Sequence, residues 1–395
     1  MLFPSSLRPT WAEINLDHLA YNLNSFRDAV GKSVKIMSVV KADGYGHGAV
    51  EVARAAVQNG CDYLGVGFID EGMELRRAGI EAPILILGYT HPQQAGELLD
   101  QRLIPTIFHL DLAWALSREA LRRSETAKVH VKVDTGMGRL GICSREDLTI
   151  FIDELNQIPS VEIEGFYTHF AAADDRDKTY TMQQMSRFEE MMQLFSGKGI
   201  EVPVWHAANS AAAIDLPESH FNMIRLGISL YGLYPSQDVQ REKVPLKPVM
   251  SLKTRVIFLK KVPPGTAISY GSIFVTQEDC WIASLPLGYG DGYSRLLSGK
   301  AQVLIKGKRF PVVGRICMDH MMVNLGSEDP KIQKGEEVVV LGRQGEEVIT
   351  AEEIAHWLGT INYEVTCAIS KRVPRVYLEK GRVKCTRTLL GNIES

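Results

Sequence analysis

Between Val34 and Gly232 the sequence alternates short β-branched runs with amphipathic stretches of helical spacing, and this alternation leaves few folds open. A strand that is followed by a helix must return over the sheet to a parallel neighbour. The runs with strand character are VKIMSVV (34–40), DYLGVGF (62–68), APILILG (82–88), IPTIF (104–108), KVHVKVD (128–134), IEGFYTHF (163–170), VPVWHAAN (202–209) and NMIRLG (222–227). Eight such strands over roughly 200 residues predict an N-terminal (β/α)8 TIM barrel of class α/β.

The stretches between these runs support the same fold. AVEVARAAVQNG (49–60) has helical spacing and ends on Gly60, a residue suited to the position after a helix, and SRFEEMMQLFSGKG (186–199) also stops on glycine. An open, doubly wound sheet is the alternative. It is disfavoured because no G-x-G-x-x-G follows the first strand, so the dinucleotide fingerprint of that fold is missing.

After about Pro245 the pattern changes to short strands separated by PPG, SGK and KGE turns. MSLKTRVIFLKKV, CWIASLPLG, AQVLIKGKRFPVVG and EEVVVLG predict a C-terminal, mostly-β domain. Its helical piece, TAEEIAHWLG (350–359), begins with Thr350 and Glu353 in capping-box positions. We therefore predict a barrel domain over residues 12–240 and a β domain over residues 241–390, the latter joined by residues 1–11.

Composition excludes several classes of protein. The chain has 395 residues, 45% hydrophobic and 23% charged, with a net charge of -3, so neither nucleic acid nor an anionic membrane is an expected partner. The start MLFPSSLRPTWAE does not resemble a secretory signal, and APILILG is too short to span a bilayer. Six cysteines without a CxxC pair predict neither disulfides nor a metal site. We expect a soluble, cytoplasmic protein.

Polar side chains stand where the predicted barrel strands end. They are Lys41 after the first strand, Arg139 after the fifth, His169 at the end of the sixth, Asn209 and Ser210 at the end of the seventh, and Arg225, with Gly227 two residues later, in the eighth. Taken singly, each has an ordinary explanation as a rim lysine, a core histidine or an ion-paired arginine. Because the carboxyl ends of barrel strands form the active-site face, their common position predicts a catalytic site.

The chemistry of such a site follows from Lys41, since lysine is rarely buried unless it is paired or used chemically. Burial lowers the pKa of a lysine and yields a neutral amine that can form a Schiff base. The loops after strands seven and eight often hold a phosphate, here with the Ser210 hydroxyl and the N–H groups of Gly227 and Ile228. These features predict pyridoxal 5′-phosphate (PLP) as a Schiff base on Lys41, with Arg225 or His169 against the pyridine nitrogen.

The motifs around these residues resemble one family over nearly the whole chain. VVKADGYGHG, VDTGMGRLG, YTHFAAAD, HAANSAA, IRLGISLYG, ISYGSIF, LPLGYGDGY, GRICMDHMMV and INYEVTC are similar to motifs of the alanine racemases. The resemblance implies an isomerase that interconverts L-alanine and D-alanine, built as a PLP-binding barrel with a C-terminal β domain. It also implies a homodimer whose active sites are shared across the interface, and a role in D-alanine biosynthesis for peptidoglycan precursors.

The resemblance assigns the two bases of the racemisation. Lys41 resembles the PLP-binding lysine, which also moves the α-proton on one face of the substrate. Tyr270, in ISYG, resembles the opposing base and comes from the partner subunit. A tyrosine pKa near 10 fits neutral pH poorly, so Tyr270 needs hydrogen-bonding or cationic neighbours, and His169 and Arg225 resemble that relay. Arg225 also resembles the partner of the pyridine nitrogen.

Further roles are carried over by matching motif. Expected cofactor contacts, besides Lys41, are Tyr45, Arg139, His169, Asn209, Ser210, Arg225, Gly227, Ile228 and Tyr363. Expected substrate contacts, besides Tyr270, are Arg139, Cys317, Met318 and Asp319, with a backbone N–H of Met318 on the carboxylate. The entrance is expected at Asp174, Tyr289, Arg295, Arg315 and Ile361. Lys132 matches a lysine that is carbamylated in some relatives, although an ordinary ion-paired lysine fits the position equally well.

Three other functions stay open at this point. A broader racemase, acting for example on serine, is the nearest alternative, because a steric pocket discriminates one hydroxyl only weakly. A PLP-carrier protein would lack the β domain that holds ISYG and CMDH. A related decarboxylase would use a β-domain cysteine, for which Cys317 would be the candidate, but Tyr270 occupies the position of the base. Synthesis of wall precursors and breakdown of D-alanine are both compatible with the sequence.

Overall fold

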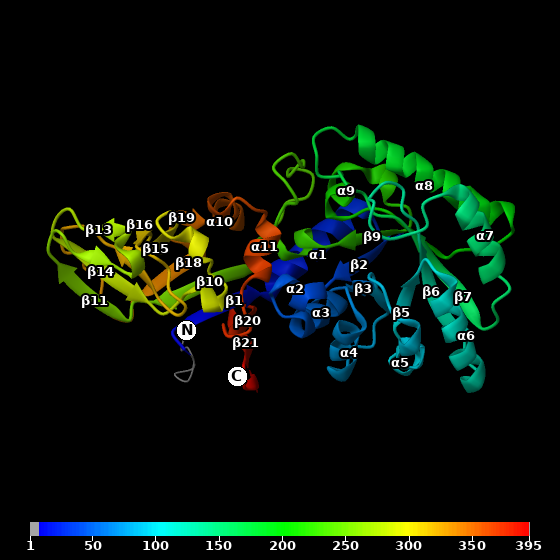
Figure 1. The fold of residues 1–395 in the computed structure, drawn as a ribbon, viewed down its shortest axis with the longest axis horizontal. Helices are drawn as coiled ribbons and strands as arrows, with labels where there is room; N and C mark the ends of the chain where they lie inside the picture. The colour runs from blue at the N-terminus through cyan, green and yellow to red at the C-terminus, as the bar shows by residue number, and fades with distance from the viewer. Residues whose placement is uncertain (1–7, 395) are drawn as a thin grey trace. The chain divides into compact units, whose positions relative to one another are not determined.

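The computed structural model describes residues 8–394, which form two compact units (Figure 1). The barrel unit contains Leu19–Gly44 and Ala49–Lys247. The β unit contains the described residues up to His18, the short segment Tyr45–Gly48, and the chain from Pro248 onwards. Of the N-terminal residues 1–11 that we assigned to the β domain, residues 1–7 lie outside the described residues. No helix in the described part of the chain combines the length and apolar character needed to cross a bilayer.

The barrel unit confirms the eight predicted strands. They are β2 (Lys35–Val39), β3 (Tyr63–Val66), β4 (Ile84–Ile86), β5 (Ile104–Ile107), β6 (Ala127–Lys132), β7 (Val161–Tyr167), β8 (Val204–His206) and β9 (Met223–Leu226). They pair in the order β8-β7-β6-β5-β4-β3-β2-β9, with every ladder parallel. The barrel is brought nearly to closure by the Arg225 N–H, which donates to the Ala208 carbonyl at 3.0 Å.

Helices α4 to α7 line the outer face of the strands (Figure 1). The helical segments up to Tyr231 are α1 (Leu16–Val30), α2 (Lys41–Tyr45), α3 (Ala49–Gln58), α4 (Ile69–Arg77), α5 (Ala95–Asp100), α6 (Leu110–Arg123), α7 (Arg145–Leu155), α8 (Thr179–Gly197) and α9 (Ser210–Asp215), with the 3-10 turns η1 (Pro92–Gln94), η2 (Pro217–Ser219) and η3 (Ile228–Tyr231). The helix predicted before Gly60 is α3, and Gly60 has a φ of 86° as a left-handed terminator requires. Helix α8 starts earlier than its apolar pattern indicated, because its first turns carry mostly polar residues.

The β unit is built on one large sheet in the order β11-β14-β17-β16-β15-β18-β10-β1-β20-β21-β22. Its strands are β1 (Thr10–Asn15), β10 (Met250–Arg255), β11 (Phe258–Val262), β12 (Ala267–Ile268), β13 (Phe274–Val275), β14 (Cys280–Leu285), β15 (Gln302–Ile305), β16 (Lys308–Val313), β17 (Met321–Asn324), β18 (Glu337–Gln344), β19 (Glu347–Ile349), β20 (Arg375–Glu379), β21 (Arg382–Thr388) and β22 (Gly391–Glu394). Strand β1, which we did not predict, lies between β10 and β20 although the three are far apart in sequence.

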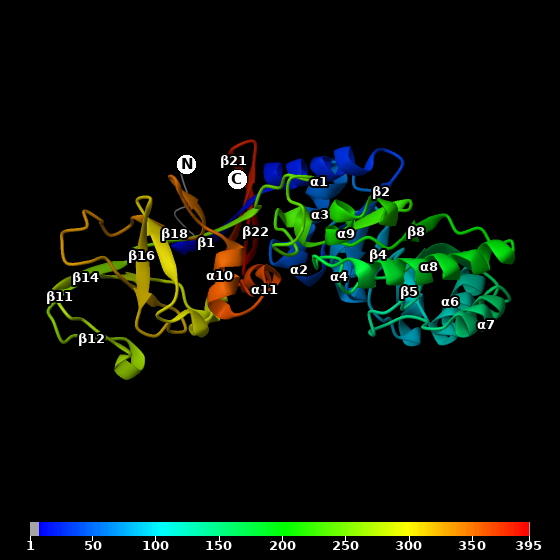
Figure 2. The same ribbon diagram turned by 90° about the horizontal axis from the view of Figure 1, so that it is seen from above.

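The helical segments of the β unit connect its strands. They are η4 (Tyr270–Ser272), η5 (Tyr289–Asp291), η6 (Arg295–Leu297), α10 (Ala351–Leu358) and α11 (Asn362–Cys367), and α10 and α11 lie side by side in both views (Figures 1 and 2). Thr350 caps α10 as predicted, with its hydroxyl accepting from the Glu353 N–H at 3.1 Å. The reciprocal half of the predicted capping box is wrong, because the Glu353 carboxylate bonds Arg309 instead, at 2.5 Å.

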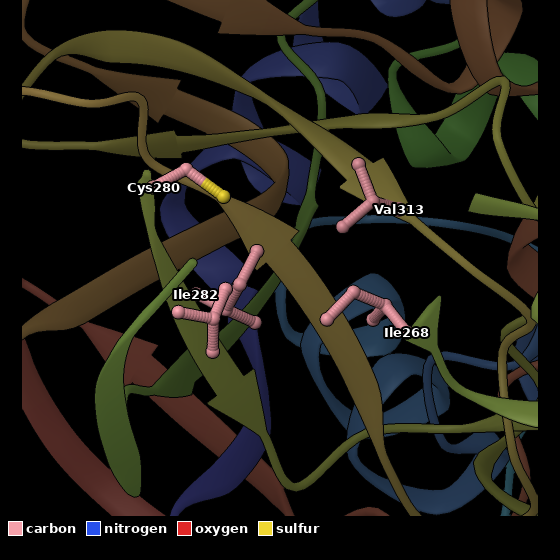
Figure 3. Packing of buried hydrophobic residues seen from close by; sticks show 5 residues of the cluster. Ile268, Cys280, Ile282 and Val313 are labelled. Atoms are coloured by element: carbon pink, nitrogen blue, oxygen red, sulfur yellow. The ribbon is translucent and has the colours of Figure 1, made fainter. Parts of the chain in front are cut away.

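A small apolar core lies where β11, β12, β14 and β16 come together (Figure 3). Val262, Ile268, Cys280, Ile282 and Val313 are all buried there, and Phe274 and Met322 pack against them. Burying side chains of this size contributes about 1.5–3 kcal/mol each. Because Ile268 ends β12, two residues before Tyr270, this core anchors one end of the segment that presents Tyr270.

Candidate active site

Lys41 stands at the carboxyl end of β2 and is followed by a left-handed turn. Ala42 (φ 53°, ψ 50°), Asp43 (φ 55°, ψ 44°) and Gly44 (φ 62°, ψ 46°) are all left-handed. Such a conformation costs about 1–2 kcal/mol for each residue with a side chain. The turn is held by the Asp43 carboxylate, which accepts from the Ala49 N–H at 3.1 Å, and by the Ala42 N–H, which donates to Glu71. Strain stored beside Lys41 is typical of a functional site.

Arg225 lies buried in β9, the neighbour of β2, and its guanidinium is bonded by two segments, residues 168–169 and 206–207. Its Nη1 donates to Nδ1 of His206 at 2.9 Å, and its Nη2 donates to Nδ1 of His169 at 3.0 Å. The same two nitrogens also bond the carbonyls of Thr168, His206 and Ala207. The Arg225 Nε–H has no hydrogen-bond partner among the described residues. It is therefore available to an acceptor outside the chain.

The electrostatics of this cluster keep the imidazoles neutral. Burial, reinforced by the charge of Arg225, lowers the pKa of both His169 and His206 well below 6.5. Burial also lowers the pKa of Arg225 to about 10, which leaves the guanidinium charged at neutral pH. No carboxylate within residues 8–394 forms an ion pair with Arg225, so its charge is balanced by hydrogen-bond acceptors alone.

An anion-binding cradle forms where the loops after β8 and β9 meet. The Ser210 Oγ accepts the N–H of Gly227 at 3.0 Å and that of Ser229 at 3.4 Å. The hydroxyl proton of Ser210 is therefore free to donate, and in the described chain the Ile228 N–H also lacks a partner. Asn209, which we predicted as a cofactor contact, uses its side-chain oxygen to cap α9 through the Ala212 N–H at 3.1 Å.

The DTGMGR loop presents Arg139 beside Lys132. The Asp134 carboxylate accepts four N–H groups of this loop, from Gly136 to Arg139, at 2.7–3.0 Å. These bonds lower the pKa of Asp134 against the opposing effect of burial. Asp134 is therefore not the ion-pair partner of Arg139 that an ordinary structural role would require. Lys132 is buried, and burial with the charges of Arg139 and Arg225 lowers its pKa to about 8.

Two residues of this cluster were missed in the sequence. Tyr167 stacks on His206, with ring centroids 4.5 Å apart, and its ring also faces the cations of Lys132 and Arg225 at 5.3 and 5.4 Å. His206 stands in the HAANS motif, three residues before Asn209. For Tyr167 the signal was its position two residues before His169, because side chains two apart on a strand share a face. His206 gave no such signal, since Val204 and Ala208 stand two residues to either side.

A second cluster of expected residues belongs to the β unit and surrounds Tyr270. The Tyr270 side chain is 71% exposed on the tip between β12 and β13. The preceding Ser269 has φ 66° and ψ −175°, a region that residues other than glycine rarely adopt. Its hydroxyl donates to the Arg315 carbonyl at 2.7 Å and lies 3.4 Å from the Cys317 sulfur. Ser269 thus fixes the Tyr270 segment to the GRICMDH loop.

The GRICMDH loop is joined in turn to the segment of Tyr289. The Tyr289 N–H donates to the Cys317 carbonyl at 3.0 Å, and the Gly290 N–H donates to the Met318 carbonyl at 2.9 Å. The Met318 N–H has no partner among residues 8–394, so it can donate a hydrogen bond to a ligand. Asp319, whose contact with substrate stays a prediction, pairs with Arg372 at 2.6 Å, which lowers the pKa of Asp319.

The remaining expected residues lie in both units. Asp174 belongs to the barrel unit, with its carbonyl bonded by Ser236 at 2.6 Å. In the β unit, the rings of Tyr45 and Tyr363 are 6.2 Å apart, Ile361 precedes α11, and Arg295 begins η6. The expected residues are therefore divided between the two units, and the structure brings only some of them together, around Arg225 in the barrel unit and around Tyr270 in the β unit. The roles assigned to them stay predictions.

Comparison with known proteins gives the same result for both halves of the chain. Residues 14–235 match the family model described as alanine racemase, N-terminal domain, and residues 249–377 match alanine racemase, C-terminal domain. The chain is 48% identical to an alanine racemase of Carboxydothermus hydrogenoformans over 94% of its length and 100% of the relative. It is 47% identical to an alanine racemase of Halothermothrix orenii over 94% of this chain and 98% of the relative.

Solved structures agree over almost the whole chain. An alanine racemase of Clostridium difficile 630 superposes with a TM-score of 0.92 at 44% identity, covering 97% of this chain and 99% of that one. The Bacillus anthracis enzyme, solved with bound L-Ala-P, gives a TM-score of 0.92 at 39% identity, covering 98% and 99%.

Proposed function

The chain belongs to the alanine racemase family, and from that premise we propose that it interconverts L-alanine and D-alanine by moving the α-proton between Lys41 and the partner's Tyr270. Racemisation needs two groups on opposite faces of the substrate, one to remove the proton and one to return it. Lys41 and Tyr270 come from different units of the chain, the barrel unit and the β unit. The proposal joins them through a second subunit.

The residues present fit PLP as the cofactor. Lys41 would carry it, the Ser210 hydroxyl and the Ile228 N–H would hold its phosphate, and the unpartnered Nε–H of Arg225 would face its pyridine nitrogen. Tyr45, Tyr363 and Gly227 are proposed as further phosphate contacts. When bound, the cofactor supplies an electron sink that weakens the Cα–H bond of the amino acid. Arg225, which stays charged at neutral pH, would donate a hydrogen bond to that nitrogen without giving up its proton.

His169 is suited to activate the partner's Tyr270. Because Arg225 only donates, Nδ1 of His169 must accept, and the neutral ring then carries its proton on Nε2. Nε2 makes no hydrogen bond within the described residues, so its proton can be donated to the tyrosine oxygen. Such a bond would stabilise the phenolate form that acts as the base.

Substrate recognition is proposed to use the charged and N–H groups nearest to these bases. The free Met318 N–H and the Arg139 side chain would bind the carboxylate of the amino acid. Tyr289, Arg295 and Arg315, with Asp174 and Ile361, are proposed to form an entrance that admits small amino acids. L-Ala-P, the ligand of the Bacillus anthracis relative, supports a substrate of this size. A cytoplasmic location stays a prediction from the sequence.

A homodimer is proposed because the Tyr270 segment exposes apolar groups. Tyr270, Ile273, Tyr289 and Met318 are all exposed on this segment and the loops bonded to it. Exposed apolar groups gathered on one set of loops are typical of a protein interface. Alanine is the preferred substrate in this proposal, with a broader racemase as the second candidate, since excluding serine by size alone yields only about 10²-fold discrimination.

The observation that carries the proposal is Arg225 held between His206 and His169 with its Nε–H free. Mixing two inactive variants, Lys41→Ala and Tyr270→Phe, tests the shared site. A hybrid dimer then has one site with both substitutions and one intact site, so random mixing should restore about a quarter of wild-type alanine racemisation. No recovery, with hybrid dimers shown to form, would refute the placement of Tyr270. A panel of L-amino acids tests specificity, and serine turned over as fast as alanine would favour the broader racemase.

A further inference from the structure

A line of buried polar side chains runs through the barrel from Arg225 to Glu164. Nη1 of Arg225 bonds Nδ1 of His206 at 2.9 Å, and Nε2 of His206 lies 2.9 Å from Nδ1 of His130. Nε2 of His130 lies 3.4 Å from Oε2 of Glu164, within ion-pair range but longer than most hydrogen bonds. All four side chains are buried. The line thus joins Arg225 to a carboxylate that it does not touch.

Hydrogen-bond chemistry fixes the protons along this line. A guanidinium only donates, so Nδ1 of His206 must be unprotonated. Burial lowers the pKa of His206 and of His130, which makes both rings neutral. His206 therefore carries its proton on Nε2 and donates it to Nδ1 of His130. The proton of His130 is left on Nε2, where it faces Glu164.

Glu164 is the acceptor that this last proton needs. Neither His130 Nε2 nor Glu164 Oε2 makes a shorter hydrogen bond to any described residue, and the Tyr63 hydroxyl also interacts with the Glu164 carboxylate. The second carboxylate oxygen of Glu164 accepts from Lys128 at 2.8 Å. Against the opposing effect of burial, the hydrogen-bonding groups of His130 and Lys128 lower the pKa of Glu164 to about 2, so the carboxylate is charged at neutral pH.

The backbone is shaped to bring Glu164 to this position. Strand β7 has a bulge at Glu164, because Val129 pairs with Ile163 while His130 pairs with Gly165. Bulges commonly redirect one side chain of a strand. At Gly165 a Cβ would lie 2.3 Å from the His130 ring, so this position requires glycine if His130 is to face the barrel interior.

We propose that Glu164 is a positioning residue for Arg225, acting through His130 and His206. Without its carboxylate, His130 would leave a buried N–H unsatisfied and would favour the opposite tautomer. His206 would then carry a proton on Nδ1, facing the N–H of Arg225, and Arg225 would lose a partner and shift. This inference rests on the proposed function, in which Arg225 faces the cofactor.

The test compares Glu164→Leu with the conservative Glu164→Gln, whose carbonyl can still accept from His130. Nitrogen-15 NMR of histidine-labelled holoenzyme reports the tautomers, because an unprotonated ring nitrogen resonates far downfield of a protonated one. We expect Nδ1 of His206 to be unprotonated in wild type and in Glu164→Gln and protonated in Glu164→Leu. Alanine kcat should fall about tenfold or more in Glu164→Leu, as when a group that orients an active-site histidine is lost, and about threefold or less in Glu164→Gln. Glu162→Gln, an exposed carboxylate on the same strand, is the matched control and should change neither reading.

Two outcomes would overturn the inference. One is a protonated Nδ1 of His206 in wild type, and the other is a Glu164→Leu protein with wild-type signals and kcat. If Glu164→Leu does not fold, His130→Leu interrupts the line one link nearer to Arg225 and should give the same change at His206, with His130→Gln as its conservative pair. Absence of racemase activity in the wild-type protein would refute the proposed function, not the role of Glu164. The histidine NMR signals are recorded without substrate, so they test the role of Glu164 independently of racemase activity.

Discussion

At the scale of single residues, Lys132 is the most unusual group that the proposed reaction does not use directly. It is buried beside two guanidinium groups, and no carboxylate within the described residues pairs with it. Lowering its pKa from 10.5 to about 8 raises the neutral fraction at pH 7 from about one in 3,000 to about one in ten. A neutral amine is a nucleophile, and the positive charges around it would stabilise an anionic product of its reaction.

We predict that Lys132 reacts with carbon dioxide to form a carbamate. The amine nitrogen forms a bond to the carbon of carbon dioxide and releases one proton, and the new anion is stabilised by Arg139. Carbon-13 NMR after addition of labelled bicarbonate should show one carbamate signal, which Lys132→Ala abolishes. Lys128→Ala, on the same strand but paired with Glu164, should keep the signal. The same signal in Lys132→Ala would contradict the prediction.

At the scale of elements, the left-handed turn after β2 is the most strained segment of the site. Tyr45, with φ 52°, extends the run of left-handed residues that starts at Ala42. The turn sets the direction in which the chain leaves Lys41, and Gly46, which follows it, passes close to other backbone. A Cβ at Gly46 would lie 2.1 Å from the Thr366 carbonyl oxygen.

The strain can be measured by making the same alanine-to-glycine substitution at a left-handed and at a right-handed position. Ala42→Gly should raise the free energy of unfolding by about 0.5–1 kcal/mol, because glycine adopts the left-handed region without a steric penalty. Ala29→Gly, at an exposed position of the right-handed helix α1, should lower it by about 0.5–1 kcal/mol. Chemical denaturation of both variants checks the prediction. A loss of stability in Ala42→Gly equal to that in Ala29→Gly would show that the turn stores no strain.

At the scale of the whole molecule, the barrel interior holds polar side chains, some of them charged, where apolar layers are usual. His130, Lys132, His206 and Arg225 point into it from three strands, and each imidazole is kept neutral by burial. Because these histidines are buried, the folded state loses stability when the pH falls. His130 and His206 bind a proton below about pH 6.5 in the unfolded chain and stay neutral in the folded one, so stability decreases as pH falls.

The expected loss is about 1 kcal/mol for each of these two histidines between pH 7 and pH 5.5. Glu164 does not contribute in this range, because its lowered pKa adds stability that is lost only below about pH 4.5. Thermal unfolding at the two pH values measures the effect. His206→Gln should reduce the dependence on pH, whereas His91→Gln, at an exposed position, should leave it unchanged. An identical dependence in His206→Gln and wild type would count against the buried, neutral state.

The local pattern of the sequence was sufficient for the eight barrel strands and for the position of Lys41 at a strand end, because both follow from hydrophobic periodicity over a few residues. It was insufficient for the insertion of β1 between β10 and β20, and for the assignment of Tyr45–Gly48 to the β unit. Those features depend on contacts between residues far apart in the chain.

The same division holds within the site. Motifs in the sequence named Arg225, His169 and Tyr270, but only the tertiary structure placed His206 and His130 between Arg225 and Glu164. Strand periodicity tells which side chains share a face, yet it does not tell which faces meet inside a closed barrel. The bulge at Glu164 interrupts the alternation of side chains along β7. The register between β6 and β7 therefore determines that the Glu164 carboxylate, and no neighbouring side chain, lies opposite His130.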